Sequence, residues 1–166
     1  MAWFTRGGDI KMEWQEIIED ILESEGDLTK DHAGWTNRGI SQRGSGFSEE
    51  KIKSLTLDET IEWYTQEFYQ RLKNIPPRLL HIACDYGVMS GVRQAVRSLQ
   101  QAANYFHSCG IDEDGYIGPA TLRAAEQVKP GQYRQFRYDY FKSLVDKDPE
   151  TYGRFAEGWY KRVMRV

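Results

Sequence analysis

The sequence predicts a mainly α-helical protein, with at most a short β-hairpin or loop region near residues 26–48. Three observations predict this class. Apolar residues recur every three or four positions along most of the 166 residues, which is the helical period. Segment 26–48 breaks that period with glycine, serine and polar residues. Prolines and N-capping residues stand where the periodic segments begin. Twenty-two aromatic residues, spread along the whole chain, supply a core and exclude a disordered protein.

The N-terminal half contains two expected helices. The first extends from about Asp9 to Ser24, and its apolar stripe consists of Trp14, Ile17, Ile18, Ile21 and Leu22. Thr56 and Glu59 have the spacing of a capping box, which predicts that the second helix starts there. One face of this second helix carries Leu57, Ile61, Tyr64, Phe68 and Leu72.

The remaining helices are expected between turn signals. Pro76-Pro77 ends one helix and opens another, which stops at Gly87. Ser90 is the expected N-cap of a long helix that reaches Phe106. A turn-rich connector follows from Cys109, and Pro119 begins a short helix that Pro130-Gly131 ends. Two aromatic-rich helices complete the chain, and Asp148-Pro149 is the expected start of the last one.

Charge and hydropathy exclude several classes of protein. The net charge of −3 divides into −6 over residues 1–75, −1 over 76–116 and +4 over 117–166. The basic C-terminal third lacks the dense Lys/Arg stripe of a nucleic-acid binder, so we expect no nucleic acid as partner. No long uncharged apolar run is present, so we expect no stable membrane insertion. Charged residues throughout positions 1–18 leave no apolar region of a signal peptide, which predicts synthesis in the cytoplasm.

The two cysteines do not predict a disulfide framework. His81 and Cys84, together with His107 and Cys109, offer an alternative as a zinc site of an amidase or peptidase. The spacing of the second pair is tighter than in the usual structural sites, so the main expectation is that no metal and no cofactor is required.

Glu25 is the strongest candidate for a catalytic residue. It follows Ile21 by four positions and Ile18 by seven, so it continues the apolar stripe rather than the wet face of the helix. Partial burial and the negative end of the helix dipole both disfavour its charged form. We therefore expect a carboxylic acid that keeps its proton near neutral pH, as a general acid that protonates a glycosidic oxygen must. A structural ion pair of Glu25 is the alternative.

Two polar residues in the following loop complete the expected catalytic set. A glycosidase needs a second carboxylate, or a polar group that holds water, on the other side of the bond from the acid. Asp31 and Thr36 follow Glu25 in the polar loop and supply these two chemistries. Either Asp31 or a water held by Thr36 is expected to support the positive sugar and the incoming nucleophile.

The residues around this loop resemble a known family. The pattern Glu25-Gly26 followed by Gly34-Trp35-Thr36-Asn37-Arg38-Gly39-Ile40-Ser41 resembles the signature of glycoside hydrolase family 108, the phage-type N-acetylmuramidases or endolysins once labelled secretion activator proteins. Downstream segments resemble the peptidoglycan-binding region that usually follows in that family: Cys84-Asp85-Tyr86 through Gly91, Ala95-Val96-x-x-Leu99-Gln100, Asp114-Gly115-x-Ile117-Gly118-Pro119-x-Thr121, and Phe155-x-x-Gly158-Trp159-x-x-Arg162. The resemblance covers about residues 10–163.

The resemblance implies a fold and a set of roles. It implies a lysozyme-like helical fold, with a catalytic lobe at 1–88 and a peptidoglycan-binding-like helical lobe at 89–166, packed as one compact body. It implies that Glu25 is the catalytic acid, delivered to a cleft between lobes, and that Thr36 and Gly39 belong to the active-site loop. Five positions depart from the family pattern: Asp27 and Leu28 replace a glycine and a tyrosine, Ala33 and Trp35 replace a glycine and a glutamate, and Met89 replaces an asparagine. The loop between Glu25 and Gly34 is also shorter than in that pattern.

Five further residues are candidates for substrate binding. Trp35 is expected to cover either a sugar or the protein's own wall, and Arg38 to hold a carboxylate of Asp31 or of the substrate. Asn37 belongs to the same loop motif, and Asp85 and Tyr116 belong to the downstream lobe. Tyr116 follows a tight turn and is expected either to stack on a sugar or to have an ordinary packing role.

The combined expectation is a monomeric peptidoglycan hydrolase that acts on glycan strands. Hydrolysis of the β-1,4 bond between N-acetylmuramic acid and N-acetylglucosamine is the reaction that the resemblance implies. A non-catalytic peptidoglycan-binding module is the alternative from another class. The resemblance also implies a phage-associated protein, or one released through a holin, that acts on the cell wall in the periplasm or outside. A prophage or bacterial origin is equally compatible.

Overall fold

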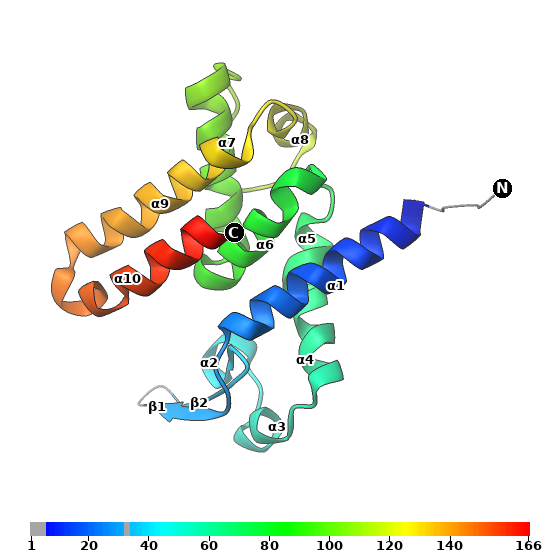
Figure 1. Ribbon diagram of the computed structural model, residues 1–166, viewed down its shortest axis with the longest axis vertical. Helices are drawn as coiled ribbons and strands as arrows, with labels where there is room; N and C mark the ends of the chain where they lie inside the picture. Colours follow the sequence, from blue (N-terminus) through cyan, green and yellow to red (C-terminus); the bar gives the residue numbers. More distant parts are fainter. Residues whose placement is uncertain (1–5, 32–33) are drawn as a thin grey trace. The chain divides into compact units, whose positions relative to one another are not determined.

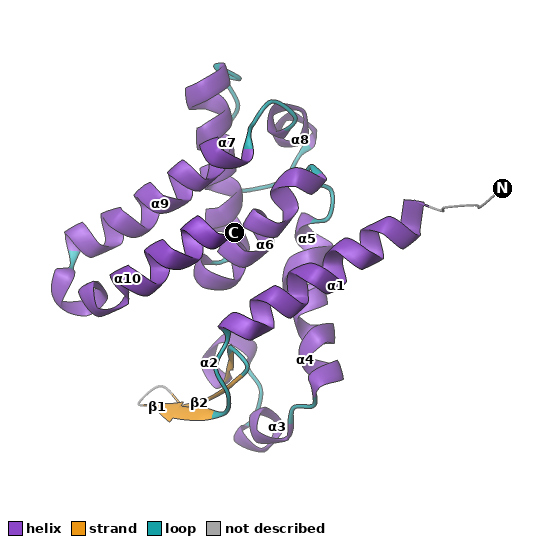
Figure 2. Cartoon of the chain, viewed as in Figure 1, coloured by secondary structure: helices purple, strands orange, loops and turns teal. Residues whose placement is uncertain are grey.

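The computed structural model describes residues 6–31 and 34–166, with side chains from Trp14 onward within those ranges. Most of the described residues are helical and a small antiparallel sheet lies near the N-terminal end, so the predicted fold class is confirmed (Figure 2). The chain forms two compact units, Met1–Gln70 and Arg71–Val166. The boundary between these units, after Gln70, lies inside the predicted catalytic lobe of residues 1–88. The predicted boundary between a catalytic and a peptidoglycan-binding lobe after residue 88 stays a prediction.

Helix α1 (Arg6–Ser24) supplies the core of the N-terminal unit. Its stripe is buried as expected, with Trp14, Ile17, Ile18 and Ile21 each exposed by 6% or less. Trp14 connects the stripe to a distant part of the chain, because its indole Nε1 donates to Thr65 Oγ1 at 2.9 Å and its ring stacks on Tyr69 at 4.8 Å. The helix ends at Ser24, the residue that the periodicity predicted.

The polar segment after α1 forms a three-stranded antiparallel sheet in the order β1-β2-β3. Its strands are β1 (Thr29–Asp31), β2 (Gly34–Asn37) and β3 (Ile40–Ser41). Two short helices follow, α2 (Gln42–Ser45) and α3 (Glu49–Ser54). The amide of Asn37, on β2, donates to the carbonyl of Ile52 at 2.9 Å, and this bond joins the sheet to α3.

Helix α4 (Leu57–Tyr64) starts with the predicted capping box of Thr56 and Glu59. It does not continue as one α-helix: a π-helical segment η1 (Thr65–Tyr69) follows, and then α5 (Gln70–Leu72). The wider π turn shifts the buried face by one residue, so Tyr69 rather than Phe68 is buried and stacks on Trp14. The predicted burial of Leu57 is wrong, because it lies in the first turn and is 51% exposed.

Beyond α5, the C-terminal unit contains five helices in the described residues, and Figure 1 labels them α6 to α10. They are α6 (Pro77–Ser90), α7 (Val92–His107), α8 (Pro119–Ala125), α9 (Pro130–Lys147) and α10 (Pro149–Arg165). Helices α9 and α10 run side by side as an antiparallel hairpin. Four of the five begin with proline, whose fixed φ and missing N–H suit the first helical turn.

Three predicted boundaries in this unit are wrong. Helix α6 continues through the buried Gly87 to Ser90, and the N–H of Gly91 donates to the carbonyl of Gly87 at 2.7 Å. Gly91, rather than Ser90, is therefore the N-cap of α7, and it provides no side-chain cap. Pro130 does not end α8 but begins α9. No helix in the described residues is both long and apolar enough to span a membrane.

Candidate active site

Glu25 lies immediately after the last residue of α1. Its backbone N–H donates to the carbonyl of Leu22 at 3.2 Å, which extends the helical path by one residue. The side chain is half-buried, whereas the neighbouring Glu23 and Ser24 are exposed. The apolar stripe thus carries this carboxylate to the surface of the N-terminal unit, as the spacing predicted.

A tight turn joins β2 to β3. Asn37 pairs with Ile40, which leaves Arg38 and Gly39 as a two-residue loop. Both have positive φ, 46° and 78°, which is the combination of a type I′ hairpin turn. A non-glycine residue rarely adopts this conformation. Arg38 is held by its guanidinium, which donates to the carbonyl of Leu55 at 3.1 Å. An interaction of Arg38 with a substrate carboxylate stays a prediction.

Gly39 brings Glu25 and Tyr64 together. A Cβ atom placed on Gly39 would lie 2.6 Å from Glu25 Oε2 and 2.4 Å from the hydroxyl oxygen of Tyr64. Real Cβ atoms do not approach other atoms so closely, so the glycine is required by its neighbours as well as by its backbone. The tip of the turn, the carboxylate that ends α1 and a hydroxyl from α4 therefore border the same small space.

Tyr64 is the residue of this cluster that the sequence did not assign to the site. Its place on the apolar face of α4 predicted a core residue, and it is 1% exposed. The hydroxyl donates to the carbonyl of Arg38 at 2.9 Å. The signal that was available is chemical: a buried tyrosine hydroxyl needs a polar partner, and that partner is usually a specific one.

The sheet separates the other predicted residues of this loop onto two faces. Thr29 pairs with Thr36 and Asp31 with Gly34, so Asp31 and Thr36 share one face. Trp35 and Asn37 alternate with Thr36 and point to the opposite face. Asp31 is exposed and Thr36 is half-buried. The two predicted supporting groups thus lie on a common surface, and the predicted sugar platform Trp35 does not lie on that surface.

The face that carries Trp35 and Asn37 packs toward α3. Two lysine ammonium groups lie over the ring of Trp35. Lys53 Nζ is 4.2 Å from the ring centroid, and Lys30 Nζ is 5.3 Å from it. The lysines cover aromatic surface that was expected to meet either a sugar or protein. Asn37 is 6% exposed and its amide donates to Ile52. A substrate contact by either side chain stays a prediction, and the position of Asn37 indicates a structural role.

Asp85 belongs to the interior of the C-terminal unit. Its carboxylate is fully buried and accepts a short hydrogen bond from the guanidinium of Arg137. The other carboxylate oxygen accepts from Arg162 Nε at 2.8 Å. Burial lowers the pKa of Arg137, and the adjacent Asp85 carboxylate opposes that shift. A role for Asp85 in substrate binding is untested, and its location indicates that it holds α6, α9 and α10 together.

Tyr116 stands at a pocket of about 380 Å³ in the C-terminal unit. Its side chain is 62% exposed, and the guanidinium carbon of Arg93 lies 4.8 Å from its ring centroid. The buried amide of Gln100 organises the preceding turn, because it donates to Asp114 Oδ1 and to the Tyr116 carbonyl and accepts from Gly115 N–H. The Tyr116 backbone N–H in turn lowers the pKa of Asp114. The ring packs against Arg93 and is also exposed, so both the ordinary packing role and the stacking on a sugar stay predictions.

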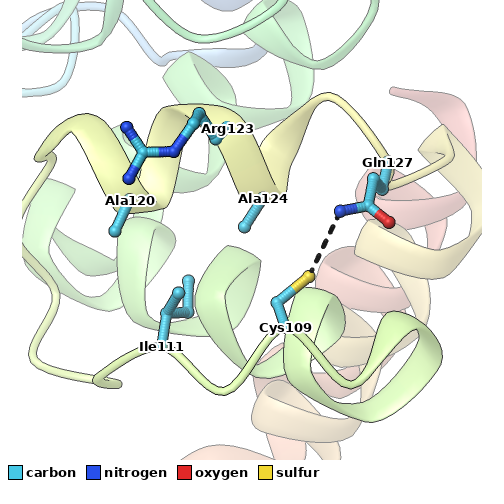
Figure 3. A pocket seen from close by; sticks show the side chains of 6 residues that line it. All are labelled: Cys109, Ile111, Ala120, Arg123, Ala124 and Gln127. Atoms are coloured by element: carbon cyan, nitrogen blue, oxygen red, sulfur yellow. Dashed lines mark hydrogen bonds between the residues drawn. The ribbon is translucent and has the colours of Figure 1, made fainter.

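A second pocket of about 210 Å³ adjoins α8 (Figure 3). The small side chains of Ala120 and Ala124 face Ile111 and Cys109 there, and Gln127 Nε2 lies 3.6 Å from the Cys109 sulfur. This pocket contains no second candidate metal ligand. Figure 3 therefore shows a cysteine beside an amide, and not a zinc site.

The alternative zinc site is wrong. Cys84 is fully buried, and burial raises the pKa of its thiol. His107 Nε2 lies 3.0 Å from the side-chain oxygen of Gln132. In the part of the chain that the structure describes, no three His, Cys, Asp or Glu side chains gather so that they could hold a metal ion. The four candidates form two close pairs in the sequence, but the fold does not bring the two pairs together as one set of metal ligands.

Comparisons with known proteins agree with this architecture. The family model described as Glycosyl hydrolase 108 matches residues 18–91, which include Glu25, the turn at Gly39, and Tyr64. Among solved structures, the "Structure of Brucella abortus SagA" is similar with a TM-score of 0.77 and 25% sequence identity, over 93% of this chain and 91% of that chain. The comparison with curated proteins gave no significant match.

Proposed function

Because residues 18–91 belong to the glycosyl hydrolase 108 family, we propose that this protein is a peptidoglycan hydrolase that cleaves the β-1,4 bond between N-acetylmuramic acid and N-acetylglucosamine. Family membership gives the class, a glycosyl hydrolase. The particular bond is our proposal, and it follows from the loop signature around Thr36 and Gly39 and from the chemistry of the residues beside it.

The observation that carries the proposal is the location of the Glu25 carboxylate. It is half-buried at the end of α1 and borders a strained turn whose glycine has no room for a side chain. A general acid must be held in one place with access to the leaving oxygen. In the proposed reaction Glu25 donates its proton to the glycosidic oxygen as the bond to the sugar breaks.

Asp31 and Thr36 are the two candidates for the second role. They share a face of the sheet, so both belong to the same surface of the N-terminal unit. If Asp31 acts as the second carboxylate, it either attacks the sugar or activates a water, according to its distance from Glu25 in the complex with substrate. If Thr36 acts, its hydroxyl holds the attacking water. Asp31→Asn and Thr36→Val, assayed together with the anomeric configuration of the product, distinguish these roles.

The C-terminal unit contributes recognition in this proposal. The exposed ring of Tyr116 beside its pocket is a surface on which a sugar of the glycan strand can stack. A monomer that acts on cell-wall glycan strands, in the periplasm or outside the cell, is consistent with the proposed substrate. Release through a holin in a phage context is part of the same proposal.

The decisive experiment replaces Glu25 with glutamine and follows the product chemistry. We expect Glu25→Gln to lower hydrolysis of purified cell walls by about 10²- to 10⁴-fold, because general acid catalysis contributes that much. Glu23→Gln is the matched control, since Glu23 is exposed two residues earlier. The wild-type digest should release new reducing ends and no new free amines. New free amines would contradict a glycosidase.

The alternative of a non-catalytic peptidoglycan-binding module makes a different prediction. In that case neither the wild-type protein nor Glu25→Gln releases reducing ends, and both sediment equally with insoluble cell walls. Loss of reducing-end release with retained sedimentation supports the enzyme, whereas an unchanged rate in Glu25→Gln contradicts the role assigned to that residue.

A further inference from the structure

Tyr64, the last residue of α4, places its hydroxyl group beside Gly39 at the proposed site. Its ring is fixed in the core by an edge contact with Trp63 at 5.2 Å and by Phe68 at 5.6 Å between ring centroids. Because the residue is 1% exposed, its hydroxyl does not exchange freely between protein and solvent partners. The hydroxyl is therefore held at a defined point beside Gly39 and Glu25.

The direction of the hydrogen bond determines what this hydroxyl can do for Glu25. A tyrosine hydroxyl has one hydrogen to donate and lone pairs with which to accept. Tyr64 donates its hydrogen to the carbonyl of Arg38, at 2.9 Å. The hydroxyl hydrogen is therefore committed to the turn, and Tyr64 acts on Glu25 through the position of that turn.

We propose that Tyr64 is a positioning residue for the catalytic acid. This inference rests on the proposed function, in which Glu25 is a general acid. Tyr64 acts through the turn: its donated hydrogen bond fixes the carbonyl of Arg38, and the turn at Arg38 and Gly39 borders Glu25 Oε2. The fixed turn keeps the Glu25 carboxyl group oriented for transfer of its proton to the leaving oxygen. Glycine fits at position 39, since a Cβ atom there would collide with the Tyr64 hydroxyl oxygen and with Glu25 Oε2.

Tyr64→Phe tests the proposal, because it removes the hydroxyl and leaves the ring. We expect kcat on soluble glycan fragments to fall by about 10- to 100-fold, because a misplaced acid transfers its proton poorly, with KM changed by less than about twofold. Tyr69→Phe is the matched control: it removes a hydroxyl from another buried tyrosine of the same unit, 7% exposed, whose ring stacks on Trp14. The control should retain the wild-type kcat.

The unfolding temperature of each variant is measured as well, and activities are compared well below the lowest transition. A role confined to folding would lower the unfolding temperature of Tyr64→Phe but leave kcat at that lower temperature near wild type, and this result would overturn the proposal. So would a loss that appears in KM alone. The result is separable from the proposed function: if Glu25→Gln abolishes hydrolysis while Tyr64→Phe retains full kcat, only the positioning role fails. If Glu25→Gln is active, the proposed function itself fails.

Discussion

The two units hold their most important carboxylates in opposite ways. Asp85, in the C-terminal unit, is fully buried between two guanidinium groups. Glu25, in the N-terminal unit, is half-buried beside a hydroxyl and a glycine. The buried ion cluster joins α6, α9 and α10, whereas Glu25 is left partly accessible to solvent. The first arrangement therefore serves the assembly of its unit, and the second is compatible with the proton transfer that we propose for Glu25.

The two units also differ in where a non-glycine residue adopts a positive φ. Arg38, with its positive φ, occupies the turn beside Glu25 in the N-terminal unit. Ser108, the corresponding non-glycine residue of the C-terminal unit, lies at the C-cap of α7, where a left-handed residue ends many helices. The turn at Arg38 and Gly39 is held instead by hydrogen bonds from other elements, from the Arg38 guanidinium to Leu55 and from the Tyr64 hydroxyl to Arg38.

The largest expected effect comes from breaking the buried ion cluster. Asp85→Ala should lower the free energy of unfolding by about 3–5 kcal/mol, because it leaves two guanidinium groups without their shared carboxylate. Urea denaturation followed by circular dichroism measures this loss. Asp139→Ala is the control, since Asp139 is an exposed aspartate on α9. Equal effects of the two substitutions would show that the cluster contributes nothing beyond surface charge.

Gly39→Ala tests whether the N-terminal cluster is as tightly packed as its distances indicate. We expect a loss of about 2–3 kcal/mol in unfolding free energy, together with loss of most hydrolysis, because the methyl group collides with Glu25 and Tyr64 in addition to the cost of a positive φ. Gly46→Ala provides a matched control. Gly46 has a φ of +73°, but a Cβ there would meet nothing within 4 Å. An equal loss of unfolding free energy in Gly39→Ala and Gly46→Ala would contradict this prediction, because it would show that contact of the methyl group with Glu25 and Tyr64 adds no cost.

The smallest expected effect concerns pH and the start of α10. Asp148 caps this helix by accepting from the backbone N–H of Thr151 at 3.0 Å, and hydrogen bonds from Thr151 lower its pKa below the usual 3.8. A lowered pKa in the folded state means that the cap stabilises the protein above the ordinary pKa and loses this effect as the pH falls through the folded value. The stability difference between wild type and Asp148→Ala should therefore shrink as the pH falls below about 4.

Thermal unfolding at several pH values measures this difference. Asp148→Asn is the control, because an asparagine caps a helix but does not titrate in this range. Its stability relative to Asp148→Ala should stay constant with pH. A difference between wild type and Asp148→Ala that grows in acid would contradict the assigned cap.

The sequence by itself determined the local features of this protein. The stripe of α1 and its end at Ser24 followed from the spacing of apolar residues, and the capping box at Thr56 and the start of α10 at Asp148 followed from residue type. These features depend on interactions within one or two helical turns, which the sequence records directly. Two predictions about single residues were wrong: the buried position of Phe68 and the capping role of Ser90. Both residues lie where the tertiary structure departs from the local pattern. Tyr69 is buried against Trp14, 55 positions earlier, and Gly87 lies in the buried part of α6.

Only the tertiary structure decided which residues surround Glu25. The sequence supplied Glu25 and the loop of Thr36 and Gly39, but it gave Tyr64 no sign of a place beside them, since the hydroxyl reaches the turn across 26 positions of chain. The strand pairing likewise separated Trp35 from Thr36, because adjacent residues of a strand point to opposite faces. Asp85 meets Arg137 and Arg162 across 52 and 77 positions. Contacts of this kind depend on how the elements pack, and no local pattern of residues encodes them.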